Sequence, residues 1–430
     1  MLKLLFALLL LTMPLTTHAQ RADSLAASYL NSHEWFKLRT LYERDSLGMS
    51  ELIRKMSGAM LAHVFGHRQE AVRRLDDLLH NHVQELGFGN IWSFVSLLAD
   101  NYHMMGHTSR AAAIMQEFVR QIDGKVNAAT VEEYRQRAGL YKELSRRILY
   151  KTDGRSTYHL PFKFEEMGDP GQSLFMMQGS VNNTSCSLCF DTGASFNVAS
   201  KEAAEQMGLR LIGPGLTAQG TTRIEGMLAI ADSISIGDMV MRNVPFVVID
   251  LMKDNEIAAS ILGKLSFLMG QPFLSRFAHY TIDIENQLIS LHTDTLHTTR
   301  EPNLSMLSTL KVLVNKGNDS LSVTLDSGAA STFLGTSYYK DYKKEVVHEG
   351  KWDIIGGAGA GGTALESVFR LPRVRLSIDG KPFVLTHIPV TALTDRGNNL
   401  TTGYGRLGTD FFRLWKKVDI DNINMRIELQ

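Results

Sequence analysis

Apolar residues in the first third of the chain recur at every third or fourth position. Between residues 21 and 150, Leu, Ala, Met and Tyr keep this spacing, and no Pro occurs. Such a period places the apolar side chains on one face of an α-helix, whereas a Pro would interrupt the helix. We therefore expect residues 20–150 to form a helical domain.

An internal echo divides this helical region. The Gly-His pair at residues 66–67 recurs 40 positions later at residues 106–107, and an Ala follows each pair at the same distance, as Ala71 and Ala111. A helix, a Gly turn and a second helix that opens on Ala resemble tetratricopeptide-like helical pairs, in which small residues allow close crossing. The resemblance implies a helical-repeat domain that serves as a spacer or shield, or as a docking surface for a peptide or protein partner.

The pattern changes at residues 151–154. Beyond them Gly and Pro become common and apolar residues come in short runs, of which residues 321–325 alternate strictly between apolar and polar. Alternation is the period of a half-buried strand, and many short strands separated by turn residues are typical of a barrel-like all-β fold. We expect a multidomain α and β protein in which the helical-repeat domain precedes an all-β region.

Two near copies of one motif end two of the predicted strands. Residues 190–195 read Phe-Asp-Thr-Gly-Ala-Ser, and residues 325–330 read Leu-Asp-Ser-Gly-Ala-Ala. Each copy places an aspartate, Asp191 or Asp326, in a tight turn. A lone Asp-Thr-Gly is often just a strand-ending turn. Two copies, each after a predicted strand, indicate a loop that is used twice.

These motifs resemble those of the aspartic peptidases, and the Ala after the Gly is more similar to the retroviral type than to pepsin. The resemblance covers roughly residues 155–430 and implies a bilobal acid-protease barrel fold, with lobes at residues 151–297 and 298–430. Residues 269–291 also align without a gap with residues 407–429. One chain would therefore carry both halves of the site, and dimerisation is not required to complete it.

The resemblance implies that Asp191 and Asp326 hold one water between them. One carboxylate takes the proton of the water while the other, protonated, polarises the scissile carbonyl of a peptide or protein substrate. Two carboxyls at such a distance cannot both ionise, so the pair shares a proton and titrates as a unit.

The remaining motif positions are expected to support this dyad. In the resembled family the hydroxyl of the second position, here Thr192 or Ser327, bonds to the opposite loop. Gly193 and Gly328 let the backbone turn and approach that loop without a Cβ clash.

Position four of the motif bears on pH dependence. Pepsin has a Ser there that bonds the ionised carboxylate, and Ala194 and Ala329 cannot do so. Losing a bond to the charged form raises a carboxyl pKa, which predicts an optimum less acidic than that of pepsin.

Further glycines are candidates for two other elements of the family. Met269-Gly270 and Leu407-Gly408 fit the strand that clamps each aspartate loop, although Gly263 is an alternative for the first lobe. Gly220, together with Gly356 and Gly357, would belong to flaps that fold over a bound peptide, because glycine suits a mobile hairpin. An ordinary flexible loop is the alternative for these positions.

The start of the chain has the pattern of a secretory signal. Lys3 gives a basic start, residues 4–11 an apolar core and Ala19 a small residue at the predicted cut. The core is too short for a retained membrane helix. We expect a secreted or periplasmic protein cut after Ala19, without stable membrane insertion after removal of the signal at residues 1–19.

Composition sets further limits. Lys and Arg number 45, as do Asp and Glu, so the formal net charge is zero and no charge bias favours nucleic acid. The two cysteines, Cys186 and Cys189, lie three apart on a predicted strand, which favours separate thiols over a disulfide or a redox or metal motif. His63 and His67 could share a helical face, but a third ligand is lacking. We expect neither a metal nor a cofactor.

Two functions of different class remain. The first is an aspartic-type endopeptidase. The second is a non-catalytic protein that retains the protease fold and binds a peptide or partner through its helical repeats. Two intact Asp-[Thr/Ser]-Gly loops favour the enzyme, because paired carboxylates are the mark of acid–base chemistry.

Overall fold

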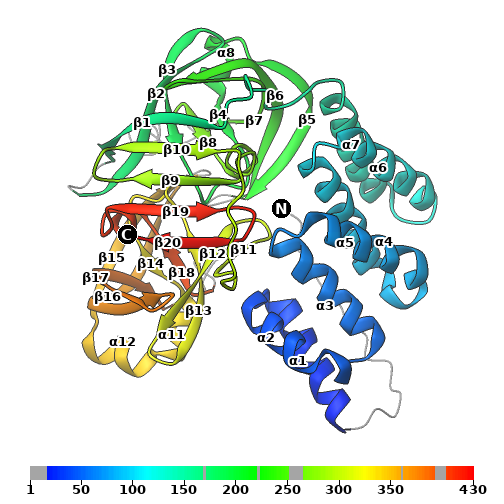
Figure 1. Ribbon diagram of the computed structural model, residues 1–430, viewed down its shortest axis with the longest axis horizontal. Coiled ribbons are helices and arrows are strands. Elements are labelled where there is room, and N and C mark those ends of the chain that lie inside the picture. The colour runs from blue at the N-terminus through cyan, green and yellow to red at the C-terminus, as the bar shows by residue number, and fades with distance from the viewer. Residues whose placement is uncertain (1–16, 168–170, 220–222, 251–264, 360–361, 393–402) are drawn as a thin grey trace. The chain divides into compact units, whose positions relative to one another are not determined.

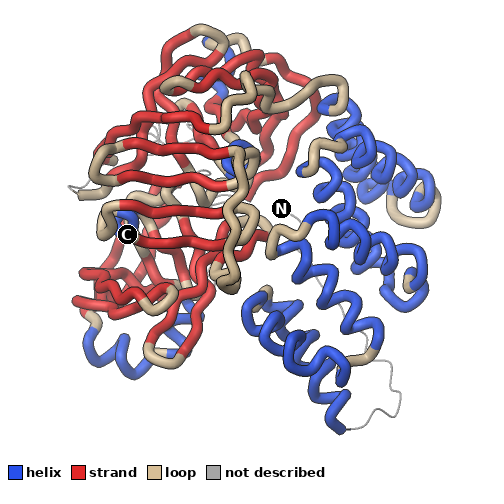
Figure 2. The backbone as a smooth tube through the Cα atoms, in the orientation of Figure 1, coloured by secondary structure: helices blue, strands red, loops and turns tan. Residues whose placement is uncertain are grey.

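The computed structural model describes residues 17–167, 171–219, 223–250, 265–359, 362–392 and 403–430. The chain divides into two compact units, Met1–Ile148 with Ser305–Leu307, and Leu149–Leu304 with Ser308–Gln430. Figure 2 shows that residues 17–148 form helices joined by loops, whereas strands dominate the second unit. A helical region followed by a β-rich, barrel-like domain is thus confirmed.

Seven α-helices account for most of the described part of the helical unit (Figure 1). They are α1 (Thr17–Ser32), α2 (Trp35–Asp45), α3 (Glu51–Val64), α4 (Arg68–Asn81), α5 (Val83–Met104), α6 (Thr108–Ile122) and α7 (Ala128–Leu144), with a 3₁₀ turn at Ser46–Gly48. Of the predicted signal segment, residues 1–16 lie outside the described residues, and the expected cut after Ala19 falls within α1. No helix in the described part of the chain is long and apolar enough to span a membrane.

The Gly-His turns join two helical pairs, α3 with α4 and α5 with α6. Gly66 and Gly106 have φ of 79° and 86°, the left-handed conformation in which glycine commonly ends a helix. Ala71 and Ala111, at equivalent places in the second helix of each pair, are fully buried. The echo in the sequence therefore corresponds to two helix–turn–helix units.

The same turn corrects the expectation that His63 and His67 share a helical face. His63 lies in the last turn of α3, and His67 is the residue that precedes α4. The reversal at Gly66 thus separates the two imidazoles onto different helices. His63 is instead bonded to Asn101 of α5, with 2.9 Å between its Nδ1 and the amide nitrogen.

Burial gives His63 a role in the acid stability of the helical unit. It lowers the His63 pKa from 6.5 to about 4. The unfolded chain therefore takes up a proton that the folded chain rejects, and stability is lost as pH falls through 6.5. Between pH 7 and pH 4 we expect a loss of about 3 kcal/mol from this group.

Thermal unfolding of the full chain at these two pH values checks this expectation. His63→Gln should lose less stability on acidification than the wild type, because Gln keeps a partner for Asn101 and does not ionise. His80→Gln, at an exposed position, is the matched control. Equal acid sensitivity of His63→Gln and the wild type would contradict the assignment.

The strands of the second unit form two sheets. Those of the first are β1 (Thr157–Glu166), β2 (Ser173–Val181), β3 (Thr184–Phe190), β4 (Val198–Ser200), β5 (Arg210–Gln219), β6 (Arg223–Ile236), β7 (Met239–Ile249), β8 (Phe267–Met269), β9 (His279–Asp283), β10 (Leu288–His292), β19 (Lys417–Asp421) and β20 (Arg426–Leu429). They lie in the order β20-β19-β9-β10-β1-β2-β3-β8-β4-β7-β6-β5.

The second sheet lies in the second half of the unit. Its strands are β12 (Leu310–Lys316), β13 (Asp319–Leu325), β14 (Phe333–Leu334), β15 (Lys351–Gly359), β16 (Gly362–Ile378), β17 (Lys381–Thr391) and β18 (Gly405–Leu407). They follow the order β12-β13-β18-β14-β17-β16-β15, and β11 (Leu304–Met306) precedes them in the chain. Short helices join the strands of both sheets: α8 (Lys201–Gln206), α10 (Gln271–Leu274), α11 (Thr336–Asp341), α12 (Lys343–Glu349) and α13 (Thr409–Phe412).

The gap-free repeat seen in the sequence is also a repeat of structure. The elements β8, α10, β9 and β10 recur in the same order as β18, α13, β19 and β20. The β9 strand pairs antiparallel with β19, with Ile282 opposite Val418, so these strands lie side by side in Figure 1. One continuous sheet therefore joins the two halves of the unit.

Turn chemistry in the two halves follows the sequence as well. Asn182 and Asn183, between β2 and β3, have φ of 48° and 66°, and Gly317, between β12 and β13, has φ of 60°. Asn and Gly tolerate this left-handed region, which tight hairpins need. Each of these hairpins ends in the strand that leads to one of the two aspartates.

Two further hairpins are relevant to the glycines predicted for flaps. In the first, β5 pairs with β6 up to Gln219 and Arg223, so Gly220 lies outside the described residues. In the second, Gly356 and Gly357 of β15 pair with Leu365 and Ala364 of β16.

Candidate active site

Each aspartate follows a central strand and is fixed by its backbone. The amide of Asp191 donates to the carbonyl of Met269 at 3.1 Å, and the amide of Asp326 donates to that of Leu407 at 2.9 Å. The acceptors belong to β8 and β18, which run parallel to β3 and β13. The same ladder therefore presents both aspartates at the ends of equivalent strands.

A glycine holds each loop against its neighbouring strand. A Cβ built on Gly270 would overlap the carbonyl oxygens of Phe196 and Ala194, and one on Gly408 would overlap the backbone of Ser331. Only a residue without a side chain fits so close an approach. Gly270 thus occupies the position expected for the clamping glycine of the first half, and its alternative, Gly263, lies outside the described residues.

Hydrogen bonds cross between the two aspartate loops. The Thr192 hydroxyl donates to the Leu325 carbonyl at 2.9 Å and accepts from the Ser327 amide at 2.9 Å. Reciprocally, the Ser327 hydroxyl donates to the Phe190 carbonyl at 2.7 Å and accepts from the Thr192 amide at 3.0 Å. Both side chains are fully buried, so water does not compete for these bonds. They lock the two loops together.

The locked loops bring the two carboxyl groups face to face. A Cβ built on Gly193 would overlap the carboxyl of Asp326, and one built on Gly328 would overlap the carboxyl of Asp191. Each carboxyl therefore packs against the backbone of the opposite loop, near enough for the two charges to act on each other. The structure thus brings together all six motif residues named from the sequence, Asp191, Thr192, Gly193, Asp326, Ser327 and Gly328.

This packing makes the size of residue 328 critical. In Gly328→Ala the added methyl must displace the Asp191 carboxyl. We expect the peptide hydrolysis proposed below to fall by about a hundredfold, since a shift of about 1 Å in a reacting group can cost that much. Steady-state kinetics on a peptide substrate measures the effect. Gly139→Ala is the control, because a Cβ at Gly139 meets no atom within 4 Å. Undiminished activity of Gly328→Ala would mean that the Asp191 carboxyl does not need this position.

Burial dominates the electrostatics of the pair. It raises the pKa of Asp191 to about 7, together with the charge of Asp326, while the Gly193 and Ala194 amides oppose the shift by donating to Asp191 Oδ1 at 2.9 Å each. Burial also raises the pKa of Asp326, against the opposing effect of Arg406. Two buried carboxyls that share one proton up to near-neutral pH suit general acid and general base roles.

Gln271 and Thr409 occupy equivalent positions in the aligned segments 269–291 and 407–429 but differ in chemistry. In the structure each side chain donates a hydrogen bond to a carbonyl of an aspartate loop. The Gln271 amide donates to the Thr192 carbonyl at 2.6 Å, and the Thr409 hydroxyl donates to the Ser327 carbonyl at 3.3 Å. The longer Gln side chain and the shorter Thr side chain therefore support the two loops at matching points.

Arg406 is a residue of the site that the sequence interpretation missed. Its Nη1 lies 3.6 Å from Asp326 Oδ2, and its guanidinium stacks over the Phe333 ring at 4.8 Å. The sequence does contain a signal for this residue. At the spacing of the gap-free repeat, Arg406 aligns with Leu268, one position before Leu407 and Met269, so a cation corresponds to an apolar residue.

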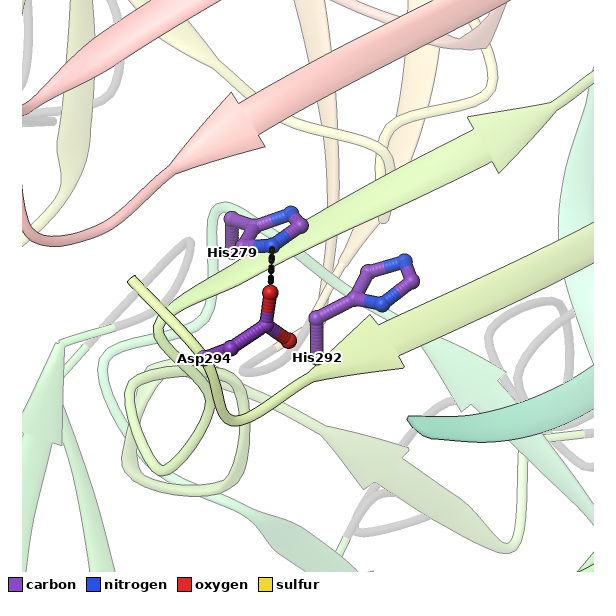
Figure 3. Close-up of side chains that lie close together, drawn as sticks. All are labelled: His279, His292 and Asp294. Atoms are coloured by element: carbon purple, nitrogen blue, oxygen red, sulfur yellow. Dashed lines mark ion pairs between the residues drawn. The ribbon is translucent and has the colours of Figure 1, made fainter. Parts of the chain in front are cut away.

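A group of potential metal ligands lies on the far side of the joining sheet. His279 and His292 are cross-strand neighbours whose rings stack at 4.3 Å and 11°, and Asp294 Oδ2 lies 3.9 Å from His279 Nε2 (Figure 3). His279 points to the opposite face of β9 from Tyr280, which contacts Phe190 beside the dyad. The nitrogen lone pairs of two stacked imidazoles lie in two parallel ring planes and do not point to one common position. We therefore assign no metal to this group.

Comparison with known proteins agrees with the geometry. Residues 177–265 match the family model for aspartyl protease. This match contains β3, the Asp191 loop and the strands up to β7, so the chain carries an aspartic protease-like domain. No curated protein matches the chain. The second aspartate, Asp326, lies outside the matched residues, and its assignment rests on the repeat and on the contacts between the loops.

Proposed function

We propose that this chain is an aspartic endopeptidase of the retropepsin-like type, built from two lobes of one polypeptide. The observation that carries the proposal is the pair of buried carboxyls, Asp191 and Asp326, held face to face by loops that bond across to each other. Burial and the neighbouring carboxyl raise the Asp191 pKa to about 7, and such a strongly shifted group in a paired site is a candidate for acid–base chemistry.

The chemistry follows from a shared proton. The ionised carboxylate removes a proton from a water between the carboxyls, and the protonated one donates to the oxygen of the scissile carbonyl, so that the water oxygen bonds to the carbon. The nitrogen then takes the proton that the dyad holds, and the C–N bond of the gem-diol breaks as one of its hydroxyls returns a proton to the dyad, which leaves a carboxylic acid and an amine. The dyad ends with one proton, as it began.

Substrate peptides are proposed to bind as extended strands beneath the β5–β6 and β15–β16 hairpins. Trp352, Ile354 and Leu365 of the second hairpin are exposed by 57%, 61% and 81%. The β15–β16 register places the three on one face of that hairpin, because Gly356 faces Leu365 and neighbouring side chains alternate. An apolar hairpin face suits contact with the side chains of a bound peptide.

The helical unit and the start of the chain complete the proposal. We infer a signal peptide cut after Ala19 and a secreted or periplasmic enzyme, on the pattern of residues 1–19. The two helix–turn–helix pairs are proposed to be tetratricopeptide-like and to offer a docking surface for a protein partner.

A digestion experiment tests the proposed activity. Denatured proteins are incubated with the purified chain across pH 3 to 8, with and without a statine-type inhibitor, and new termini are identified by mass spectrometry. Inhibitor-sensitive cleavage is the expected result. Peptide binding without cleavage at any pH would favour a binding protein that retains the fold.

A further inference from the structure

The two halves of the dyad match in backbone but differ in charge. Both aspartates have an equivalent loop, an equivalent cross-loop hydroxyl and an equivalent clamping glycine. Arg406, by contrast, belongs to one half only. Its Nη1 lies 3.6 Å from Asp326 Oδ2, and the residue at the matching position of the first half, Leu268, carries no charge.

The matching positions are defined by the strand register. Arg406 of β18 lies opposite Phe333 of β14, and Leu268 of β8 lies opposite Val198 of β4. Leu268 joins an apolar cluster that includes Cys189. The apolar pair of the first half is thus replaced by an aromatic residue and a cation in the second.

The aromatic residue fixes the orientation of the cation. The guanidinium of Arg406 lies over the Phe333 ring at 4.8 Å from its centroid, an arrangement that is favourable for a cation above a π face. Its side chain is 34% exposed, and its Nε makes no hydrogen bond within the described residues. The contact with Asp326 is therefore an electrostatic one between groups held by separate strands.

We propose, on the basis of the function proposed above, that Arg406 is a positioning residue that places the single negative charge of the dyad on Asp326 and its proton on Asp191. A dyad with equal surroundings would distribute the proton between both carboxyls. A cation that is nearer to one of them favours the microstate in which that one is ionised.

Backbone amides favour the ionised form of both carboxyls. Gly193 and Ala194 donate to Asp191 Oδ1 at 2.9 Å each, and Gly328 donates to Asp326 Oδ1 at 3.1 Å. The assignment therefore depends on the charge of Arg406, which must outweigh the additional amide bond at Asp191.

In β3, the Cys189 thiol lies near enough for the charges of both carboxyls to act on it. Burial, the largest cause, and these charges raise its pKa well above the usual value, so it stays neutral. The dominant charges at the pair are thus Asp191, Asp326 and Arg406. Burial raises the pKa of both carboxyls, and Arg406 lowers both. Its effect is the largest of those that oppose the rise at Asp326 and the smallest of those at Asp191.

The assignment gives each carboxyl a fixed part in the reaction. Asp326 takes the proton from the water, and Asp191 donates its proton to the scissile carbonyl. Together with the cation, the monoanionic dyad has no net charge, which lessens the cost of keeping a carboxylate in a buried site.

The pH dependence of catalysis tests this proposal. Removal of the cation makes every ionisation of the dyad harder, so Arg406→Met should shift both limbs of the kcat/KM profile to higher pH. For unit charges about 4 Å apart in water-like surroundings we expect a shift of about one pH unit. Arg406→Lys keeps the charge and should restore most of the profile. A purely structural role would lower the rate without moving the limbs.

A second measurement does not depend on activity. The chain is labelled with [4-¹³C]aspartate, and the two carboxyl resonances, assigned from Asp191→Asn and Asp326→Asn, are followed against pH. In the wild type the Asp326 resonance should move mainly in the first step and that of Asp191 mainly in the second. In Arg406→Met the first step should rise by about one pH unit.

The two measurements separate the two proposals. Absence of cleavage together with the expected titration would reject the peptidase and keep the role of Arg406. Cleavage with an unchanged titration in Arg406→Met would reject the role of Arg406 alone. If Arg406→Met does not fold, exchange of the pair in Arg406→Leu with Leu268→Arg decides the matter, since the first step should then belong to Asp191. An order that stays with Asp326 overturns the proposal.

Discussion

Asp191→Asn and Asp326→Asn should each reduce kcat/KM for peptide hydrolysis by about a thousandfold or more, because each removes one of two proton-transfer groups that act as a unit. Asn has the size of Asp, so the loops keep their packing. Initial rates on a peptide found in the digestion experiment measure the loss. Asp294→Asn, at an exposed carboxyl beyond β10, is the matched control and should retain full activity.

The same substitutions should have opposite effects on activity and on stability. The folded-state pKa of Asp191 is raised above its unfolded value, so the folded state loses stability as pH rises from about 4 to about 7. Asp191→Asn removes this loss, and its midpoint of thermal unfolding at pH 8 should exceed that of the wild type. An Asp191→Asn protein that is inactive and less stable at pH 8 would instead indicate a damaged fold.

Thr192→Val should destabilise the protease-like unit by about 3 kcal/mol and abolish most of its activity. The Thr192 hydroxyl serves both the Ser327 amide and the Leu325 carbonyl. Valine has the same shape but leaves these two buried groups without partners, at a cost of about 1–3 kcal/mol each. Denaturant unfolding of the full chain, followed by near-ultraviolet circular dichroism, measures the change in stability.

Thr192→Ser is the control for that experiment. It keeps the hydroxyl and reproduces the residue that the second loop has as Ser327. We expect its stability to lie close to that of the wild type. If Thr192→Val were as stable as Thr192→Ser, the cross-loop bonds would contribute little to holding the dyad.

These predictions describe one trade-off. Ionisation of two neighbouring carboxyls in a buried site opposes folding, and the site persists because the surrounding bonds fix both loops. Thr192 and Ser327 supply bonds between the loops, and Gln271 and Thr409 support their carbonyls. Weakening the bonds should lower stability and activity together, whereas removing a carboxyl charge should lower activity and raise stability at pH 8.

Much of the fold was predictable because the relevant signals are local or repeated. The helical period before residue 150, the strict alternation at residues 321–325 and the turn at Asn182 each depend on the near neighbours of a residue in the chain. The segments 269–291 and 407–429 repeat these signals at a constant spacing, and this repeat predicted two similar halves.

Other features depended on the path of the chain in three dimensions. His63 and His67 have helical spacing, but Gly66 ends α3 between them and sends them to separate helices. Gln271 and Thr409 differ in chemistry, yet both reach the carbonyl of an aspartate loop, since the longer side chain compensates for its position. Such equivalences follow from distances that a linear pattern does not contain.

By itself, the sequence determined that two Asp-[Thr/Ser]-Gly loops exist and that each ends a strand. Both the alternation of apolar side chains in a strand and the conformation of a tight turn depend on consecutive residues. Only the tertiary structure decided how alike the two aspartates are. Arg406 acts on Asp326 through space, from a strand about 80 residues further along the chain, and the strength of a charge depends on separation and burial, not on position in the sequence.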